Sequence, residues 1–340
     1  MDYENLKRIQ EKYGNTKGGD VFDETFKKVA DLLFDESGER SLPFAGVPTI
    51  LDAPQATELE GLDVALVGVP MDLGVTNRPG ARFGPRAVRG IERIGPYNHV
   101  LNVAPVAQAK VSDFGDVPMR SRYSLESCME DIEAHFNKIV DAGVRPLSVG
   151  GDHSISHPIL KAVGRDEPVA LVHFDAHCDT SGDYDMSKFH HGAPFRNAVM
   201  DGVIDPQKTI QIGIRGSAEF LWEFSYDSGM TVIHAEEFAE MGIDAVIAKT
   251  LEVVGDTPAY ISFDVDALDP SFAPGTGTPE VGGLTPRECQ AVIRGLGDLN
   301  IVGGDVVEIA PQYDSTTNTV QVGAQMLFEI LCLMVASQKE

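Results

Sequence analysis

Apolar and polar positions form two alternating kinds of segment from Leu62 onward. Short apolar runs rich in Val and Ile alternate with longer segments whose apolar residues recur at helical spacing, and Gly, Pro, Asp or Asn separate them. The runs that predict strands are residues 64–69, 146–149, 169–174, 209–214, 230–233, 259–263 and 301–310. The segments that predict helices are residues 124–142, 154–163, 244–254, 286–296 and 319–335. Apolar strands that alternate with helices predict a parallel sheet with helices on both faces, in a single α/β domain.

The first 60 residues lack this alternation. They are polar and irregular, and one amphipathic helix is predicted around residues 22–34. We expect residues 1–60 to form an N-terminal arm that packs on its own domain or on a neighbouring subunit, and residues 61–340 to form the main domain.

Charge and composition narrow the class of protein. The chain of 340 residues has 52 acidic and 27 basic residues, and a formal net charge of −25. Such a surface repels nucleic acid and anionic membranes, so we exclude both as partners. The polar N-terminus lacks the apolar core of a secretory signal, and no apolar run approaches the roughly 20 residues that span a bilayer. We therefore expect a cytoplasmic protein. The four cysteines are scattered, which excludes a disulfide framework and a zinc ribbon.

Four predicted strands lead directly into ionisable residues. The four sequences are PLSVGGDHS, ALVHFDAHCDT, YISFDVDALDP and IVGGDVVEIAP. Ligands bind at the carboxyl ends of strands in open parallel sheets, so we expect these residues to meet at one edge. An isolated buried carboxylate costs several kcal/mol, and a bound cation removes that cost.

The spacing of these residues predicts two metal ions. Side chains at alternate positions of an extended segment share a face, as in Asp175-x-His177-x-Asp179 and Asp264-x-Asp266. The complete set of predicted ligands is His153, Asp175, His177, Asp179, Asp264 and Asp266. Zinc takes three or four protein ligands, so six fit a pair of divalent ions better. The mostly oxygen set favours Mn²⁺, with Ni²⁺ or cobalt as alternatives. Taken alone, GGDH or DVDALDP is also consistent with a capped turn.

Three of these segments resemble the signatures of a known family. GGDHS, DAHCD and SFDVDALDPSFAPGTGTPE are similar to motifs of the ureohydrolases, the family of arginase, agmatinase and the guanidino-acid hydrolases. The segment GVTNRPGARFGPRAVR and the first 60 residues look closest to the agmatinase-like branch. The resemblance implies a three-layer α/β/α fold on an eight-stranded, mainly parallel sheet. It also implies trimers or hexamers, with residues 61–340 as the catalytic domain.

The resemblance also implies a role for each residue of the site. One ion takes His153, Asp175, Asp179 and Asp264, and the other takes Asp175, His177, Asp264 and Asp266, so that two carboxylates bridge. HHGAPF places a proton-shuttling histidine at His191, and GGDVVEIAPQYD places the carboxylate that holds the substrate guanidinium at Glu308. The implied reaction is hydrolysis of a guanidino compound to urea and an amine by a hydroxide that bridges the metals. In our hypothesis, Asp266 accepts the proton of that hydroxide.

The substrate is less defined than the reaction. The stretch by which arginases hold an α-amino acid is replaced by SGDYDMSKFHHG, so arginine is not expected. We expect Asp183 and Tyr184 in this loop to contact the substrate, and the acidity of the loop favours a cationic or uncharged tail, as in agmatine, guanidine or a substituted guanidine. Arg120 and Arg122 offer an alternative in which a guanidino acid such as guanidinobutyrate or guanidinopropionate binds.

Other activities remain as alternatives. They include a biguanide-type hydrolase that needs a related partner subunit, a formimino hydrolase, and a catalytically silent subunit. Paired histidines such as His190 and His191 also occur in one-zinc deacetylases, but there the pair precedes the ligand strand, whereas here it follows.

Overall fold

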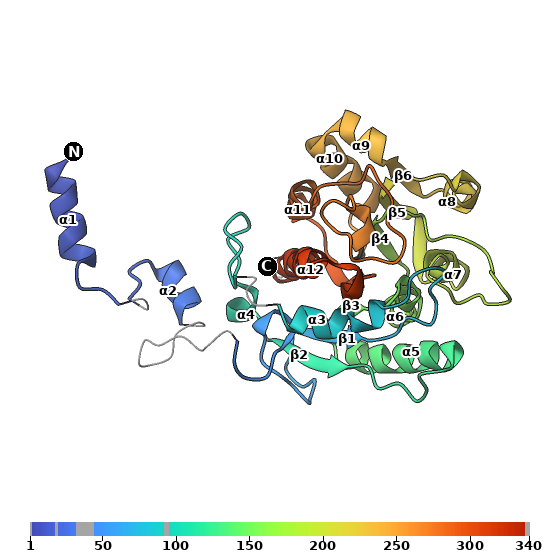
Figure 1. The fold of residues 1–340 in the computed structure, drawn as a ribbon, viewed down its shortest axis with the longest axis horizontal. Helices are drawn as coiled ribbons and strands as arrows, with labels where there is room; N and C mark the ends of the chain where they lie inside the picture. The colour runs from blue at the N-terminus through green and yellow to red at the C-terminus, as the bar shows by residue number, and fades with distance from the viewer. Residues whose placement is uncertain (1, 18–19, 32–43, 92–94, 337–340) are drawn as a thin grey trace.

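A single eight-stranded sheet forms the centre of the molecule (Figure 1). The computed structural model describes residues 2–17, 20–31, 44–91 and 95–336. Every strand pairs in parallel with its neighbours, in the order β2-β1-β3-β8-β7-β4-β5-β6. The strands are β1 Val64–Val69, β2 Val111–Asp116, β3 Arg145–Gly150, β4 Val169–Phe174, β5 Ile204–Ile214, β6 Thr231–His234, β7 Ala259–Asp264 and β8 Ile301–Val307. The predicted eight-stranded parallel sheet is confirmed, and here it is parallel throughout.

Helices cover both faces of the sheet, which gives the predicted three layers. Alternation along each strand sends side chains to opposite faces, so Leu66 joins one apolar core and Val67 the other. The first core is covered by α3 Gly84–Arg89, α10 Ile243–Val254, α11 Pro286–Gly295 and α12 Asn318–Ala336. The second is covered by α5 Leu125–Asp141, α6 Ser156–Val163 and α7 Pro194–Met200. The strands β1, β4 and β7 are buried along their whole length, and their sequences are therefore mainly apolar runs.

The C-terminal helix α12 is a core helix of this domain. It is long and apolar enough to cross a membrane by length and composition, but 78% of its apolar window is buried inside the molecule. Its one acidic residue, Glu329, is buried and accepts hydrogen bonds from Arg294 of α11 at 2.9 Å and 2.5 Å and from Asn98 at 2.6 Å. The carboxylate therefore ties α12 to α11 and to the segment before β2.

The sequence pattern missed the edge strand β2. Its sequence, VSDFGD, contains two Asp and a Gly, which are depleted in strands, but an edge strand needs less burial than a central one. The short helices α4 Pro105–Gln108, α8 Glu223–Ser228 and α9 Ala235–Met241 lie in the connections and were also missed.

The N-terminal segment lies apart from the layers. Figure 1 shows α1 Tyr3–Tyr13 and α2 Glu24–Ala30 to one side of the sheet, and α1 has no buried residue. Phe26 of α2 packs edge-on against Tyr97 of the main body. The predicted helix at 22–34 corresponds to α2, and its last part lies outside the described residues. Packing of this arm on a neighbouring subunit stays a prediction.

The strand order explains why the charged residues meet. The four strands that lead into ionisable residues are β3, β8, β7 and β4, and they are adjacent in the sheet. All run in the same direction, so their carboxyl ends lie side by side at one edge.

Candidate metal centre and the cavity beside it

His153 stands at the first of the two ligand clusters. The Gly150–Gly151 turn after β3 places it in a buried 3-10 turn that Asp152 caps. A Cβ on Gly151 would lie 2.2 Å from the carbonyl oxygen of Met71, so this close approach of two loops requires glycine. His153 Nδ1 faces one carboxylate oxygen each of three residues and is hydrogen-bonded to none of them. The distances are 3.1 Å to Asp175, 2.9 Å to Asp179 and 3.3 Å to Asp264.

His177 stands at the second cluster. Its Nδ1 lies 3.3 Å from Asp175 Oδ1 and 3.2 Å from Asp266 Oδ2. Asp175 thus directs Oδ2 at the His153 cluster and Oδ1 at the His177 cluster. The two clusters share a carboxylate, as a bridging ligand requires.

The spacing of the donors fits metal ions. Two ligands about 2.1 Å from one ion and at roughly right angles lie about 3 Å apart. The measured separations of 2.9–3.3 Å match this value. Imidazole nitrogens and carboxylate oxygens that crowd together without hydrogen bonds are the donor set of a divalent cation.

The electrostatics of the clusters point the same way. Burial, together with the charges of Asp266 and Asp175, raises the pKa of Asp264 well above its usual range. Burial and Asp175 likewise raise the pKa of Asp266 to about 6. Burial opposes charge on His153, yet the surrounding carboxylates raise its pKa well above the usual range. The carboxylates therefore attract positive charge, which metal ions supply.

A further shell of polar residues orients the ligands. His173 Nε2 lies 2.8 Å from Asp175 Oδ2, and Gln211 donates to its Nδ1 at 3.0 Å. His153 Nε2 lies 2.8 Å from the hydroxyl of Ser262, which donates to Asp305 at 2.6 Å. The sequence analysis gave His173 no role. Its position two residues before Asp175 continues the alternate spacing of the ligands, so this spacing could have predicted that His173 lies at the site.

Glu308 lies next to the metal ligands and is 1% exposed. It follows β8 with φ at 63°, a left-handed conformation that is uncommon for residues other than glycine. Its Oε1 accepts from the backbone N–H of His153 at 3.0 Å and lies 3.0 Å from His191 Nδ1. Its Oε2 is buried and has no hydrogen-bond partner among the described residues.

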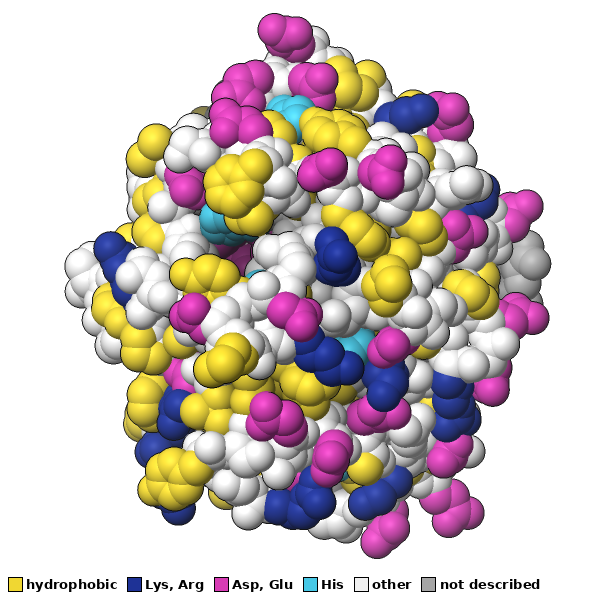
Figure 2. All heavy atoms as spheres, turned by 90° about the vertical axis from the view of Figure 1, so that its right-hand side faces the viewer, with side chains coloured by type: hydrophobic (Ala, Val, Ile, Leu, Met, Phe, Trp, Pro, Cys, Tyr) yellow, Lys and Arg dark blue, Asp and Glu magenta, His cyan; other side chains and the backbone are white. Residues whose placement is uncertain are grey.

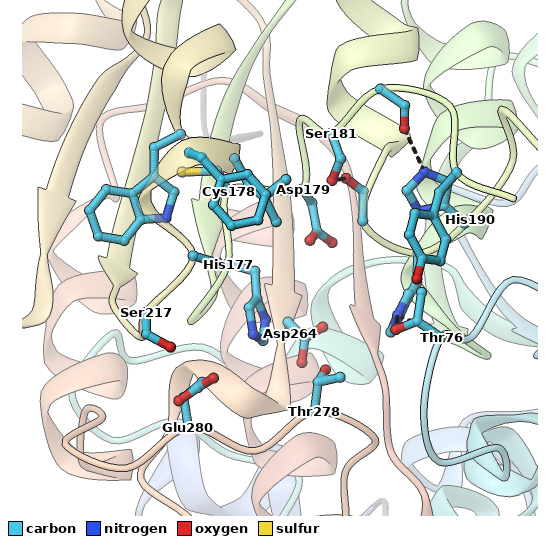
Figure 3. A pocket seen from close by; sticks show the side chains of 18 of the residues that line it. Thr76, His177, Cys178, Asp179, Ser181, His190, Ser217, Asp264, Thr278 and Glu280 are labelled. Atoms are coloured by element: carbon cyan, nitrogen blue, oxygen red, sulfur yellow. Dashed lines mark hydrogen bonds between the residues drawn. The ribbon is translucent and has the colours of Figure 1, made fainter.

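A cavity of about 440 Å³ opens beside these residues. In Figure 3, His177, Asp179 and Asp264 point into it, Thr76 and His190 line one wall, and Glu280 and Thr278 lie below. Figure 2 shows a hollow on this face with histidine and acidic side chains inside it and hydrophobic side chains at its rim. The predicted substrate-contacting residues Asp183 and Tyr184 both line the cavity.

Charge in the cavity is distributed unevenly. The only Arg or Lys among its described lining residues is Arg215, which is 4% exposed. Its guanidinium donates to the carbonyl oxygens of Gly213, Asp266, Ala267, Leu268, Glu280 and Val281. These bonds use its donors, so Arg215 is not available for a ligand. The alternative role for Arg120 and Arg122 is not supported, because Arg120 pairs with Glu130 and Asp131 and Arg122 lines a separate pocket.

The structure thus brings together all six predicted ligands with His191 and Glu308. Sequence reasoning missed Thr76, Arg215, Trp222 and Glu280 among the lining residues. They come from connections after β1, β5 and β7, whose positions a linear pattern does not give.

Comparison with known proteins agrees with this geometry. A sequence model of the arginase family matches residues 62–333. A guanidinopropionase from Pseudomonas aeruginosa is 48% identical over 298 residues, which is 86% of this chain and 93% of that protein. A mitochondrial agmatinase from Gallus gallus is 47% identical over 85% of this chain and 86% of its own length. Among solved structures, a proclavaminate amidino hydrolase from Streptomyces clavuligerus superposes with a TM-score of 0.84 at 35% identity, covering 88% of this chain and all of that one.

Proposed function

The chain belongs to the arginase family, and from this premise we propose that it hydrolyses a guanidino compound to urea and an amine at a pair of divalent metal ions. It is a hydrolase of C–N bonds in linear amidines.

The main observation in support of a guanidino substrate is the Oε2 of Glu308, which is buried and has no hydrogen-bond partner among the described residues. A buried carboxylate oxygen without a donor is costly, and the other oxygen of this carboxylate accepts from the backbone N–H of the predicted ligand His153. A guanidinium presents N–H groups in a planar fork that matches a carboxylate. A guanidino substrate bound there supplies the missing hydrogen bond and the balancing charge.

The six ligands would hold two ions, one at the His153 cluster and one at the His177 cluster. Asp175 faces both clusters and Asp264 faces the first, and both stay predicted as the ligands that the two ions share. When bound, divalent ions supply positive charge to the reaction centre and lower the pKa of water from about 15.7 towards neutrality. Four carboxylates among six donors favour Mn²⁺, and the two imidazoles keep Ni²⁺ as an alternative.

Asp266 and His191 suit the two proton transfers of the reaction. Asp266 is buried, and its Oδ2 lies 3.2 Å from His177 Nδ1, so the carboxylate is placed to accept a proton at the His177 cluster. Burial lowers the pKa of His191, but the neighbouring Glu308 raises it to about 9. His191 is therefore a source of the proton that the departing amine needs.

The cavity favours a substrate whose tail is cationic or uncharged. Asp183 and Glu280 bring carboxylates to its wall, and the buried Arg215 has no donor left for a substrate carboxylate. Agmatine or a substituted guanidine fits this wall. A guanidino acid is the second candidate, because one relative at 48% identity is a guanidinopropionase. A biguanide-type hydrolase with a partner subunit is the third.

The direct test is urea release by the purified chain, loaded separately with Mn²⁺ and Ni²⁺. The panel is agmatine, guanidine, guanidinobutyrate, guanidinopropionate and a biguanide. We expect urea from agmatine or a neutral guanidine. Urea from a guanidino acid alone would show that the substrate tail carries a carboxylate and overturn our assignment. If the chain binds two ions and releases urea from none of these compounds, a partner subunit is missing.

Glu308→Gln tests the guanidinium site itself. The change keeps the size of the side chain and removes its charge, so we expect both metal ions to stay bound and turnover to fall by about 100-fold or more. Metal content by mass spectrometry and urea release are the two measurements. Normal turnover would show that Glu308 does not bind the substrate guanidinium.

For the whole chain we propose a cytoplasmic homo-oligomer, a trimer or hexamer, in which the N-terminal arm contacts a neighbouring subunit. The exposed apolar side chains of α1 and α2 support this, among them Tyr3, Tyr13 and Phe26.

A further inference from the structure

Several hydrogen bonds anchor the loop between β1 and α3, and its residue Thr76 lines the cavity. The carboxylate of Asp72 accepts from the backbone N–H of Gly80 at 2.6 Å and pairs with Arg82. Farther along the loop, Gln312 donates to the carbonyl oxygen of Pro79 at 2.6 Å. The middle of the loop is fixed through Gly74, whose N–H donates to the buried Asp152 at 2.8 Å.

This loop contacts His191 at two points. The carbonyl oxygen of Gly74 accepts from the backbone N–H of His191 at 2.9 Å. Thr76 contacts the ring itself: its backbone N–H donates to Nε2 at 3.1 Å, and its Oγ1 lies 2.6 Å from the same nitrogen. Thr76 also lines the cavity (Figure 3).

These contacts define the tautomer of the neutral ring. A backbone N–H only donates, so the Nε2 that faces Thr76 must be unprotonated. The proton is then on Nδ1, which donates to Oε1 of Glu308 at 3.0 Å. In this state the Thr76 hydroxyl also donates to Nε2.

When the His191 ring is protonated, Nε2 carries a hydrogen and needs a hydrogen-bond acceptor in place of a donor. An Nε2–H cannot bond to the N–H of Thr76, because both are donors. A hydroxyl rotates and has lone pairs, so Oγ1 can accept where it previously donated. Of the two Thr76 groups that contact Nε2, only Oγ1 can therefore serve both states of the ring, and Thr76 and His191 both line the cavity.

We propose that Thr76 is a positioning residue for His191, holding the neutral ring in its Nδ1–H tautomer and accepting the Nε2–H of the protonated ring at the cavity wall. The role of the ring in proton transfer rests on the proposed function, whereas the tautomer does not. In this transfer the Nε2–H bond breaks and an N–H bond forms on the amine as its C–N bond to the substrate carbon breaks, and the Thr76 hydroxyl keeps its own proton.

Thr76→Val and Thr76→Ser test the proposal as a matched pair. Valine has the shape of threonine without the hydroxyl, and serine keeps the hydroxyl without the methyl group. With the metal-loaded protein and its best substrate, we expect Thr76→Val to lower kcat by about 10- to 100-fold with KM within about threefold. Thr76→Ser should stay within about threefold of the wild type in both constants. Metal content and the circular dichroism spectrum should be unchanged in both.

The tautomer is read independently of turnover by the ¹⁵N chemical shifts of the His191 ring, assigned by their loss in His191→Asn. The neutral ring is the form observed at a pH above the His191 pKa of about 9, and there we expect the Nδ1–H tautomer in the wild type and in Thr76→Ser, and a mixture of tautomers in Thr76→Val. A raised KM with normal kcat would make the hydroxyl a substrate contact. Equal losses in both variants would make it a packing residue. Either result overturns the proposal. If the proposed function is wrong, no guanidine in the panel will release urea. The ¹⁵N shifts of the ring test the tautomer in that case too, because they do not depend on turnover.

Discussion

Two acidic residues of the site have backbone conformations that most residues avoid. Asp179 has φ at 52° and Glu308 at 63°. Left-handed conformations of residues other than glycine cost free energy and concentrate at functional sites. Here they turn one carboxylate towards the His153 cluster and the other towards His191. Asn and Asp tolerate this region better than other residues, so Asp179→Asn removes a charged ligand with little effect on the backbone.

The metal count per chain should depend on which ligand is changed. Asp179 faces only the His153 cluster and His177 only the other, whereas Asp175 faces both. We expect Asp179→Asn and His177→Asn each to keep about one ion and Asp175→Asn to lose both. Mass spectrometry of metal after gel filtration measures this. Two ions retained by Asp175→Asn would contradict the shared carboxylate.

At the scale of residues, the spacing in the sequence selected side chains that the structure brings together, because their signal is local. Asp175, His177 and Asp179 follow one strand at alternate positions, and Asp264 and Asp266 repeat the spacing. Thr76 could not be predicted in the same way. It contacts a histidine far along the chain through a backbone N–H, and the sequence cannot indicate such a contact because nearly every residue has a backbone N–H.

At the scale of elements, one buried ion pair holds the edge strand to the helix layer. Arg89 of α3 donates to both oxygens of Asp113 on β2, at 2.8 Å and 3.0 Å, and to Asp116 at 2.6 Å. Burial raises the pKa of Asp113, but the hydrogen bonds from Arg89 and two backbone N–H groups bring it below its usual value. The polar sequence of β2 is therefore explained by a partner on another element, which is why the apolar pattern did not reveal the strand.

Arg89→Met should destabilise the fold by about 2–4 kcal/mol at neutral pH, because it leaves a buried carboxylate without its partner. The folded-state pKa of Asp113 is depressed, so its stabilisation is present above the unfolded pKa of about 3.9 and is lost as the pH falls through the lower folded value. The difference between wild type and variant should therefore be steady from about pH 5 to 8 and narrow below about pH 4.

Urea denaturation followed by circular dichroism measures this difference. Arg165→Met is the matched control, because Arg165 pairs with Asp141 at the surface, where ion pairs contribute little. An equal fall in the urea midpoint for both variants would show that the pair on β2 has no special role.

At the scale of the whole molecule, the arm and the main domain differ in how they are stabilised. The domain has an apolar core on each face of its sheet, whereas α1 buries no side chain. In the sequence, the alternation of strands and helices begins only at Leu62, and the division into an arm of residues 1–60 and a domain of residues 61–340 stays a prediction. The sequence could not predict what the arm contacts, because an exposed apolar face does not specify its partner.

Removal of residues 1–17 should leave the domain folded and able to bind two ions, because none of the described side chains in α1 is buried. If the arm joins subunits, the truncated chain should form a smaller assembly. Light scattering coupled to gel filtration gives the mass of each form. An unchanged mass would restrict the arm to its own domain.

The adjacency of β3, β8, β7 and β4 has a consequence for the time course of folding. The ligands His153 and Asp264 are distant in sequence and approach each other only when the strands that precede them, β3 and β7, have both paired with β8. Contacts between residues far apart in the sequence form slowly, because the entropic cost of closing the loop comes before the contacts stabilise the chain. A short segment of the nascent or unfolded chain cannot assemble either cluster. Uptake of metal during refolding should therefore follow completion of the central sheet, and its rate would report the last step by which the chain becomes native.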